Sequence, residues 1–156
     1  MIIIDPSMDE DTSHIIGYSA RICQNLFKLT EVEVLITFNE EASEGYEAVT
    51  IPGKDKFLVA LNPSIEWNED ELVKTIGHEL THVKQFTYDG LKFEFEDVVV
   101  FKDNEYRFEN SMEYWLSPWE IEARGYEAAI LVLYLGENNE KGLTSSSSAF
   151  SSSSSC

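Results

Sequence analysis

Cysteine and basic residues are scarce in this chain of 156 residues, and each scarcity excludes a class of protein. The two cysteines, Cys23 and Cys156, cannot supply the several cross-links on which a small disulfide-rich secreted domain depends. Only 11 Lys and Arg face 29 Asp and Glu, so the formal net charge is -18. Solubility explains so acidic a surface, and a preference for basic substrates or partners is the alternative explanation. In either case the surface repels phosphate backbones. We therefore expect no nucleic-acid partner.

Long apolar runs are also missing from the sequence. No stretch approaches the roughly 18 consecutive apolar residues of a membrane-spanning helix. The N-terminal run Ile2–Ile4 is too short for the apolar part of a signal peptide, and no basic region precedes it. Together with the scarcity of cysteine, these features predict a cytoplasmic protein with no membrane partner.

The composition that remains is typical of one folded domain followed by a tail. Hydrophobic residues make up 43% of the chain and aromatic residues 12%, which is enough for a hydrophobic core. We place a single domain at residues 1–143. Residues 144–156 hold nine serines and few apolar residues. Because such a segment cannot bury enough apolar surface to order itself, we expect this tail to be disordered.

The spacing of apolar residues and of turn signals predicts an α+β fold. Apolar residues recur every three to four positions in the predicted helices and alternate in the predicted strands. In chain order we expect a helix capped by Asp11, Thr12 or Ser13, strands at about 31–38, 45–51 and 56–61 in a small mixed twisted sheet, a helix from Asn68 to about Tyr88, a β-hairpin over 91–109, and a helix from Pro118 to about Leu135.

The helix that follows Asn68 contains the motif H-E-x-x-H, formed by His78, Glu79 and His82. Positions four apart lie one above the other on a helix, so both imidazoles can bind one metal ion. Zinc accepts nitrogen ligands in a tetrahedral arrangement, and a catalytic site leaves one position for water. Glu79 is then placed to act as the general base towards that water.

A chance match of five residues is the alternative interpretation, since bare H-E-x-x-H occurs in unrelated chains. Its context favours a real site. The motif lies in the middle of the predicted helix, and His78 and His82 lie off the apolar stripe that faces the core. The chain has only three histidines in total. We therefore predict one bound Zn²⁺, with both motif histidines as ligands.

A third protein ligand is expected, and the last predicted helix offers three glutamates. Glu120 is the third residue of a capping box that begins at Ser117, which accounts for it without a metal. Glu122 has no such role and shares a helix face with apolar residues, where a carboxylate needs a partner. We predict Glu122 as the third ligand, with Glu120 as the alternative and Glu127 as a weaker one.

Three further polar residues are candidates for contacts with a ligand or a substrate. Gln85 lies on the same face of the motif helix as His78 and can orient a ligand or touch substrate. Tyr114 and Tyr126 can donate a hydrogen bond to an oxyanion, although packing in the core explains either of them as well.

These motifs resemble those of the zincin metallopeptidases, and within them of the gluzincin type with two histidines and a glutamate. The resemblance rests on the motif His78-Glu79-Leu80-Thr81-His82 and on the later pair Glu122-Ala123, and it covers roughly residues 56–127. The surrounding segments look most like small metallopeptidase-like proteins of bacteriophages and bacteria. The resemblance implies a minimal zincin-like fold, with the last helix carrying the third ligand, and hydrolysis of peptide bonds in a bacterium or a phage-infected host cell.

The resemblance also implies how a peptide or protein substrate is held. Zincins bind extended peptide along an edge strand above the active-site helix. In this chain that strand would be Phe57-Leu58-Val59-Ala60-Leu61. The rival interpretation is a regulatory or structural zinc-binding protein without turnover. Glu79 favours the enzyme, because a purely structural site has no need of a general base.

Overall fold

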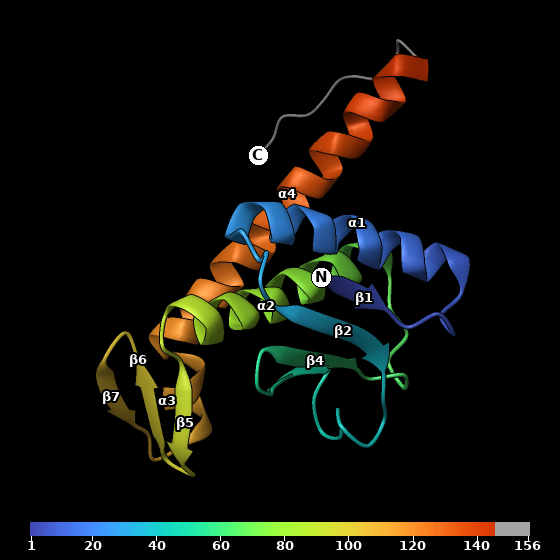
Figure 1. The fold of residues 1–156 in the computed structure, drawn as a ribbon. Coiled ribbons are helices and arrows are strands. Elements are labelled where there is room, and N and C mark those ends of the chain that lie inside the picture. The colour runs from blue at the N-terminus through green and yellow to red at the C-terminus, as the bar shows by residue number, and fades with distance from the viewer. Residues whose placement is uncertain (146–156) are drawn as a thin grey trace.

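A computed structural model describes residues 1–145 of the chain and confirms the α+β class. It contains four helices and two separate sheets among the described residues (Figure 1). The elements are β1 (Ile2–Ile4), α1 (Glu10–Phe27), β2 (Glu33–Phe38), β3 (Ala48–Pro52), β4 (Lys56–Leu61), α2 (Glu69–Tyr88), β5 (Lys92–Phe95), β6 (Val98–Phe101), β7 (Asn104–Arg107), α3 (Ser111–Trp115) and α4 (Pro118–Ser145).

The larger sheet is mixed, as predicted, and has the strand order β1-β2-β4-β3. β1, β2 and β4 run parallel, while β3 pairs antiparallel with β4. The prediction that residues 57–61 form an edge strand is therefore wrong, because β4 is paired on both sides. The almost unbroken apolar run of β4 fits an internal strand. The edge strand on this side is β3, and the opposite edge, β1, was not predicted as a strand.

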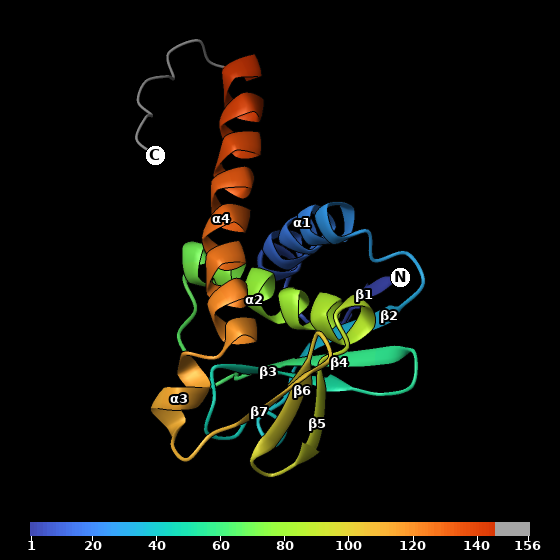
Figure 2. The ribbon, with the colours of Figure 1, turned by 90° about the vertical axis from the view of Figure 1, so that its left-hand side faces the viewer.

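Helices α1 and α2 lie on the same side of this sheet, and α4 crosses α2 (Figures 1 and 2). One core cluster joins buried residues of α1, α2 and α4 to the inner strands β2 and β4. The first helix begins earlier than predicted, because Asp9, and not a residue from 11 to 13, accepts the capping hydrogen bond from Thr12. The predicted N-cap of α2 is confirmed, since Asn68 accepts from the backbone N–H of Glu71.

α2 and α4 approach each other closely at Gly77, the residue before the first motif histidine. A Cβ atom at this position would lie 3.1 Å from the side chain of Ile130 on α4. The absence of a side chain at Gly77 therefore lets α4 lie against the motif face of α2. This crossing is what brings the glutamates at the start of α4 to the two histidines.

The segment between α2 and α4 holds more structure than the predicted hairpin. It forms a three-stranded antiparallel sheet, β5-β6-β7, followed by the short helix α3. Both lie at one end of the molecule (Figure 2). A second, smaller core forms here around the fully buried Trp119. The sequence prediction of a hairpin over residues 91–109 therefore missed one strand.

α4 also differs from its prediction, because it continues past Leu135 to Ser145. Gly136 is a weak helix former but does not end a helix by itself, since its cost relative to Ala is only about 1 kcal/mol. Residues 146–156 of the predicted serine-rich tail lie outside the described residues. Among the residues that are described, no helix combines the length and apolar character needed to cross a membrane.

Candidate metal centre

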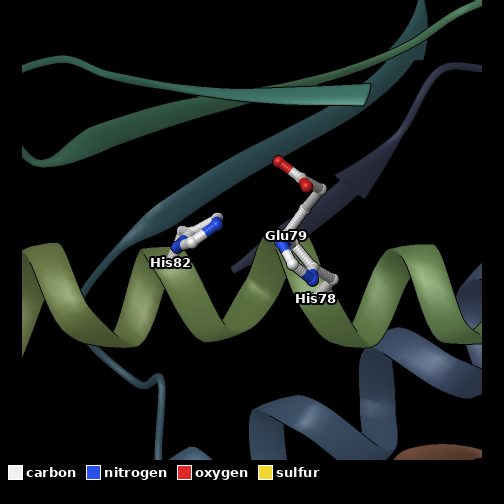
Figure 3. Close-up of side chains that lie close together, drawn as sticks. All are labelled: His78, Glu79 and His82. Carbon is white, nitrogen blue, oxygen red and sulfur yellow. The ribbon is translucent and has the colours of Figure 1, made fainter. Parts of the chain in front are cut away.

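Three side chains of one helix converge beside the larger sheet. Ligand atoms of His78, Glu79 and His82 all lie within 4.8 Å of one another. Figure 3 shows the three side chains on α2, with the Glu79 carboxylate reaching towards the strands. Glu79 is buried and the histidines are mostly buried. The predicted grouping of these three residues on one helix face is thus present in the structure.

The carboxylate that meets both histidines belongs to Glu120. Its Oε1 lies 3.2 Å from Nε2 of His78, and its Oε2 lies 3.1 Å from Nε2 of His82. Glu120 therefore does not serve the predicted capping box, and the hydroxyl of Ser117 has no hydrogen-bond partner among the described residues. Glu122, which we predicted to face the histidines, does not do so. Glu120 faces them instead, because its hydrogen bonds with two buried imidazoles are stronger than bonds with the neutral N–H groups of a helix end.

The Nδ1 atoms of the two histidines are held by acceptors that fix the ring tautomers. Nδ1 of His78 donates to Oε2 of Glu127 at 2.8 Å, and Nδ1 of His82 donates to Oε1 of Gln85 at 2.8 Å. A carboxylate and an amide oxygen can only accept, so each Nδ1 must carry a hydrogen. In a neutral ring the lone pair then lies on Nε2, which is the atom that faces Glu120.

Glu122 supports His82 indirectly, through Gln85, and does not face the two Nε2 atoms. The side-chain amide N–H groups of Gln85 donate to Oε1 of Glu122 and to the carbonyl oxygen of Trp119, both at 2.9 Å. These two bonds leave Oε1 of Gln85 directed at His82. The ammonium group of Lys84 lies 3.1 Å from the same Glu122 oxygen and offsets its charge. Glu122 thus helps to orient His82 through Gln85, which is the orienting role that we predicted for Gln85.

The two histidines and Glu120 shift one another's pKa. Burial disfavours the charge on His78, but hydrogen bonds with Glu120 and Glu127 outweigh it and raise the pKa of His78 to about 10. Burial also opposes the charge on His82, but the hydrogen bond with Glu120 and the negative charges of Glu79 and Glu120 together outweigh it and raise the pKa of His82. Burial opposes ionisation of Glu120, yet bonds from the two imidazoles lower its pKa to about 2.

These shifts predict that metal-free protein is most stable between pH 4.5 and 6.5, the ordinary pKa values of Glu120 and His78. The contribution of His78 is complete below pH 6.5 and is lost as the pH rises towards about 10. The contribution of Glu120 is present above pH 4.5 and is lost as the pH falls towards about 2. Thermal melts followed by circular dichroism in the presence of chelator measure this dependence. A melting temperature that climbs above pH 6.5 would contradict it.

Glu79 is oriented by Thr50 of the edge strand β3. The Thr50 hydroxyl lies 2.9 Å from Oε1 of Glu79 and 3.1 Å from the Glu79 carbonyl oxygen. Both oxygens are acceptors, so Thr50 is the donor. Within residues 1–145, Oε2 of Glu79 has no hydrogen-bond partner. No sequence pattern links residues 50 and 79, and Thr50 was not predicted.

A cavity of about 660 Å³ opens against these residues. Its lining includes the three motif residues, Glu120 and Tyr114, which is one of the two tyrosines predicted as an oxyanion donor. Burial raises the pKa of Tyr114 to about 12, so its hydroxyl stays protonated and able to donate. The other, Tyr126, does not line this cavity. Its ring packs edge-on against Phe27 at 4.9 Å, and the prediction of an oxyanion role for it is withdrawn.

The donor set fits a zinc ion. Two Nε2 atoms and one carboxylate are the ligand types of catalytic zinc sites, and both rings carry the outer hydrogen bonds that such ligands need. Comparison with protein families, with curated proteins and with solved structures finds no match for this chain. The resemblance to zincins therefore rests on the motif and stays a prediction.

One signal in the sequence could have indicated Glu120. Glu120 and Glu127 are seven residues apart, and two turns of helix place them on one face. Glu122 is rotated away from that face by about 200° relative to Glu120. Two glutamates on one face, of which Glu120 faces both Nε2 atoms and Glu127 faces Nδ1 of His78, form a stronger pattern than a single glutamate on an apolar stripe.

Proposed function

We propose that the protein is a zinc-dependent metallopeptidase, with His78, His82 and Glu120 as the three ligands of one zinc ion. The observation that carries the proposal is the position of Glu120, whose two oxygens face the two Nε2 atoms at 3.2 and 3.1 Å. Glu120 replaces Glu122 in the ligand set. This is the two-histidine, one-glutamate set of the gluzincin type that the motif resembles.

The zinc ion would lower the pKa of a bound water and polarise the peptide carbonyl. Glu79 accepts the proton of the attacking water at Oε2, because the Thr50 hydroxyl occupies Oε1. Glu79 then passes that proton to the leaving amine. Tyr114, which also lines the cavity, is available to donate a hydrogen bond to the oxyanion that develops on the former carbonyl oxygen.

The edge strand β3 is the proposed docking site for an extended peptide. Ala48, Val49 and Thr50 line the cavity, and β3 pairs with β4 on one side and with no other strand of the described residues. An unpaired edge can hydrogen-bond to the main chain of a substrate. β3 therefore takes the role that the sequence prediction gave to β4. The expected cytoplasmic location stays a prediction.

A zinc-binding regulatory or structural protein without turnover remains the second candidate function. The same ligand set supports it, because Glu120 and the histidines would hold an ion with or without catalysis. Glu79 favours the enzyme: it is buried beside the ligands, is oriented by Thr50 and borders an open cavity. A carboxylate that is held in this orientation at the edge of a cavity is placed to exchange a proton with a water beside the ligands.

Removal of the metal tests the proposal. Purified protein that is loaded with zinc is expected to cleave members of a mixed peptide library, as measured by mass spectrometry. Dialysis against a chelator should abolish cleavage, and one equivalent of zinc should restore it, because the attacking water needs the ion. Cleavage that survives full loss of zinc would come from a contaminating peptidase or from another mechanism. Stoichiometric zinc binding with no cleavage would favour the second candidate function.

A further inference from the structure

The cavity beside the proposed zinc site has one apolar, aromatic part. Besides the ligands and β3, its lining includes Tyr46, Phe86, Leu91, Phe93, Tyr114 and Trp115. We call Tyr46, Phe93 and Trp115 the aromatic wall. A volume of about 660 Å³ lies within the range of roughly 300–1,000 Å³ of ligand sites. It is large enough to receive a side chain of a substrate as well as its main chain.

The aromatic wall is exposed, although its members could have packed in a core. The exposed fractions are 66% for Tyr46, 50% for Phe93 and 53% for Trp115. The three residues come from three segments: the loop before β3, strand β5 and helix α3. Exposed aromatic residues that gather around a concave site are typical of surfaces that bind an apolar group.

Phe93 is attached to the body of the protein by a row of rings. Its ring centroid lies 5.9 Å from that of Phe86 on α2, and Phe86 lies 6.0 Å from Phe57 on the internal strand β4. Both contacts are within the 4.5–7 Å range in which aromatic pairs attract each other. Phe93 is thus fixed in position at the cavity, and a substrate that packs on it need not order it first.

The charges of the cavity lining favour one class of side chain over another. No Lys or Arg lines it within the described residues, and its acidic members are Glu79 and Glu120. An acidic side chain of a substrate would lose water there beside these two carboxylates. Arg124 lies outside this lining, where its guanidinium stacks 3.8 Å from the centroid of the Trp115 ring and donates to the Trp115 carbonyl oxygen. An apolar ring would lose only unfavourable contact with water.

We propose that the aromatic wall selects substrates with a bulky apolar side chain, above all an aromatic one, next to the bond that is cleaved. Phe93 is the specificity-determining residue, and acidic side chains are rejected at that position. This inference rests on the proposed peptidase function and names the class of its substrate.

Phe95 provides a matched control for Phe93. Both are phenylalanines of β5, and Phe95 is 71% exposed. The register of β5 against β6 shifts between the two, which breaks the usual two-residue alternation. Only Phe93 lines the cavity. Neither substitution by alanine removes a residue of the two hydrophobic core clusters, so both variants should fold, as thermal melts will verify.

The test uses blocked hexapeptides of alanine and glycine that carry Phe, Leu, Ala or Asp at one central position. We expect kcat/KM of the wild-type protein to fall in that order. Phe93→Ala should reduce the preference for Phe over Ala about 10-fold or more, the scale of lost apolar contacts in a specificity pocket. Phe95→Ala should leave the preference unchanged. Equal effects of the two substitutions, or a preference for Asp, would overturn the inference.

A binding measurement separates failure of this inference from failure of the peptidase proposal. The same peptides are titrated by calorimetry into zinc-loaded Glu79→Gln protein, which keeps every lining residue except Glu79 and leaves the aromatic wall unchanged. Tighter binding of the Phe peptide that is lost in Glu79→Gln/Phe93→Ala supports the aromatic wall even if the wild-type protein cleaves nothing. Cleavage without any preference for Phe supports the peptidase proposal and overturns the inference that the aromatic wall selects the substrate. Absence of binding of the Phe peptide overturns the wall whatever the activity.

Discussion

Glu79→Gln is expected to lower kcat for peptide hydrolysis by about 100- to 10,000-fold, the range for loss of a general base, while zinc stays bound. Gln has the shape of Glu and its amide oxygen can still accept the hydrogen bond that Thr50 now donates to Oε1 at 2.9 Å. It cannot take up a proton from water. The proposed ligands His78, His82 and Glu120 are untouched, so the substitution separates proton transfer from metal binding.

The measurement pairs initial rates on a cleaved peptide with zinc content determined by mass spectrometry. Glu71→Gln is the matched control, because Glu71 lies on the same helix, is exposed and does not line the cavity. It should have wild-type activity and wild-type zinc content. Wild-type rates in the Glu79→Gln protein would disprove the proposed role of Glu79. Equal and complete inactivity of all three proteins, each with one zinc, would favour a binding protein without turnover.

Glu120→Gln is expected to weaken zinc binding by more than about 100-fold. Residues that only hydrogen-bond to a metal ligand already contribute about 10- to 100-fold to the metal affinity, so loss of a ligand itself should cost more. The substitution removes the negative charge that faces both Nε2 atoms and leaves a poorer ligand. Glu122→Gln should weaken zinc binding by no more than about 10- to 100-fold, because Glu122 is connected to the proposed ligands only through Gln85 and His82.

Competition with a chromophoric chelator gives both affinities under one set of conditions. The two variants make the same chemical change two positions apart on α4, so general effects on this helix cancel in the comparison. A larger loss in Glu122→Gln than in Glu120→Gln would restore the ligand set that the sequence first favoured. Unchanged affinity in both would mean that neither Glu120 nor Glu122 is a ligand.

The α2 helix with its motif could be predicted because the information is local. The cap at Asn68, the apolar stripe and the four-residue spacing of the histidines all lie within one element. The position of β4 could not be predicted in the same way. Strand order depends on which distant segments pair, and the pairing of β2 with both β1 and β4 joins segments that are far apart in the chain.

The third carboxylate shows how a sound local pattern can mislead. Ser117 and Glu120 have the spacing of a capping box, and a capping box satisfies two backbone donors. The structure gives Glu120 two buried imidazoles instead, and bonds to such groups are stronger than those to neutral backbone donors. The competing partners lie 42 and 38 residues away on another helix, out of reach of any pattern within α4.

Other parts of the site come from segments whose approach only the tertiary fold determines. Thr50 contacts Glu79 across 29 residues of sequence, because β3, paired antiparallel with β4, lies against the motif helix. The aromatic wall likewise combines a loop, a strand and a short helix. Each of these residues has an ordinary place in its own element, so the sequence gives no reason to group them.

The proposed ligands lie on both sides of the segment that forms β5, β6, β7 and α3, since His78 and Glu120 are 42 residues apart. A zinc ion held by both would act as a removable cross-link that closes this segment into a loop. Closing a loop lowers the conformational entropy of the unfolded chain, much as a disulfide does, and this chain has no disulfide among its described residues. The metal would then determine resistance to heat and to proteolysis as well as chemistry, and the gain in melting temperature would grow with zinc concentration.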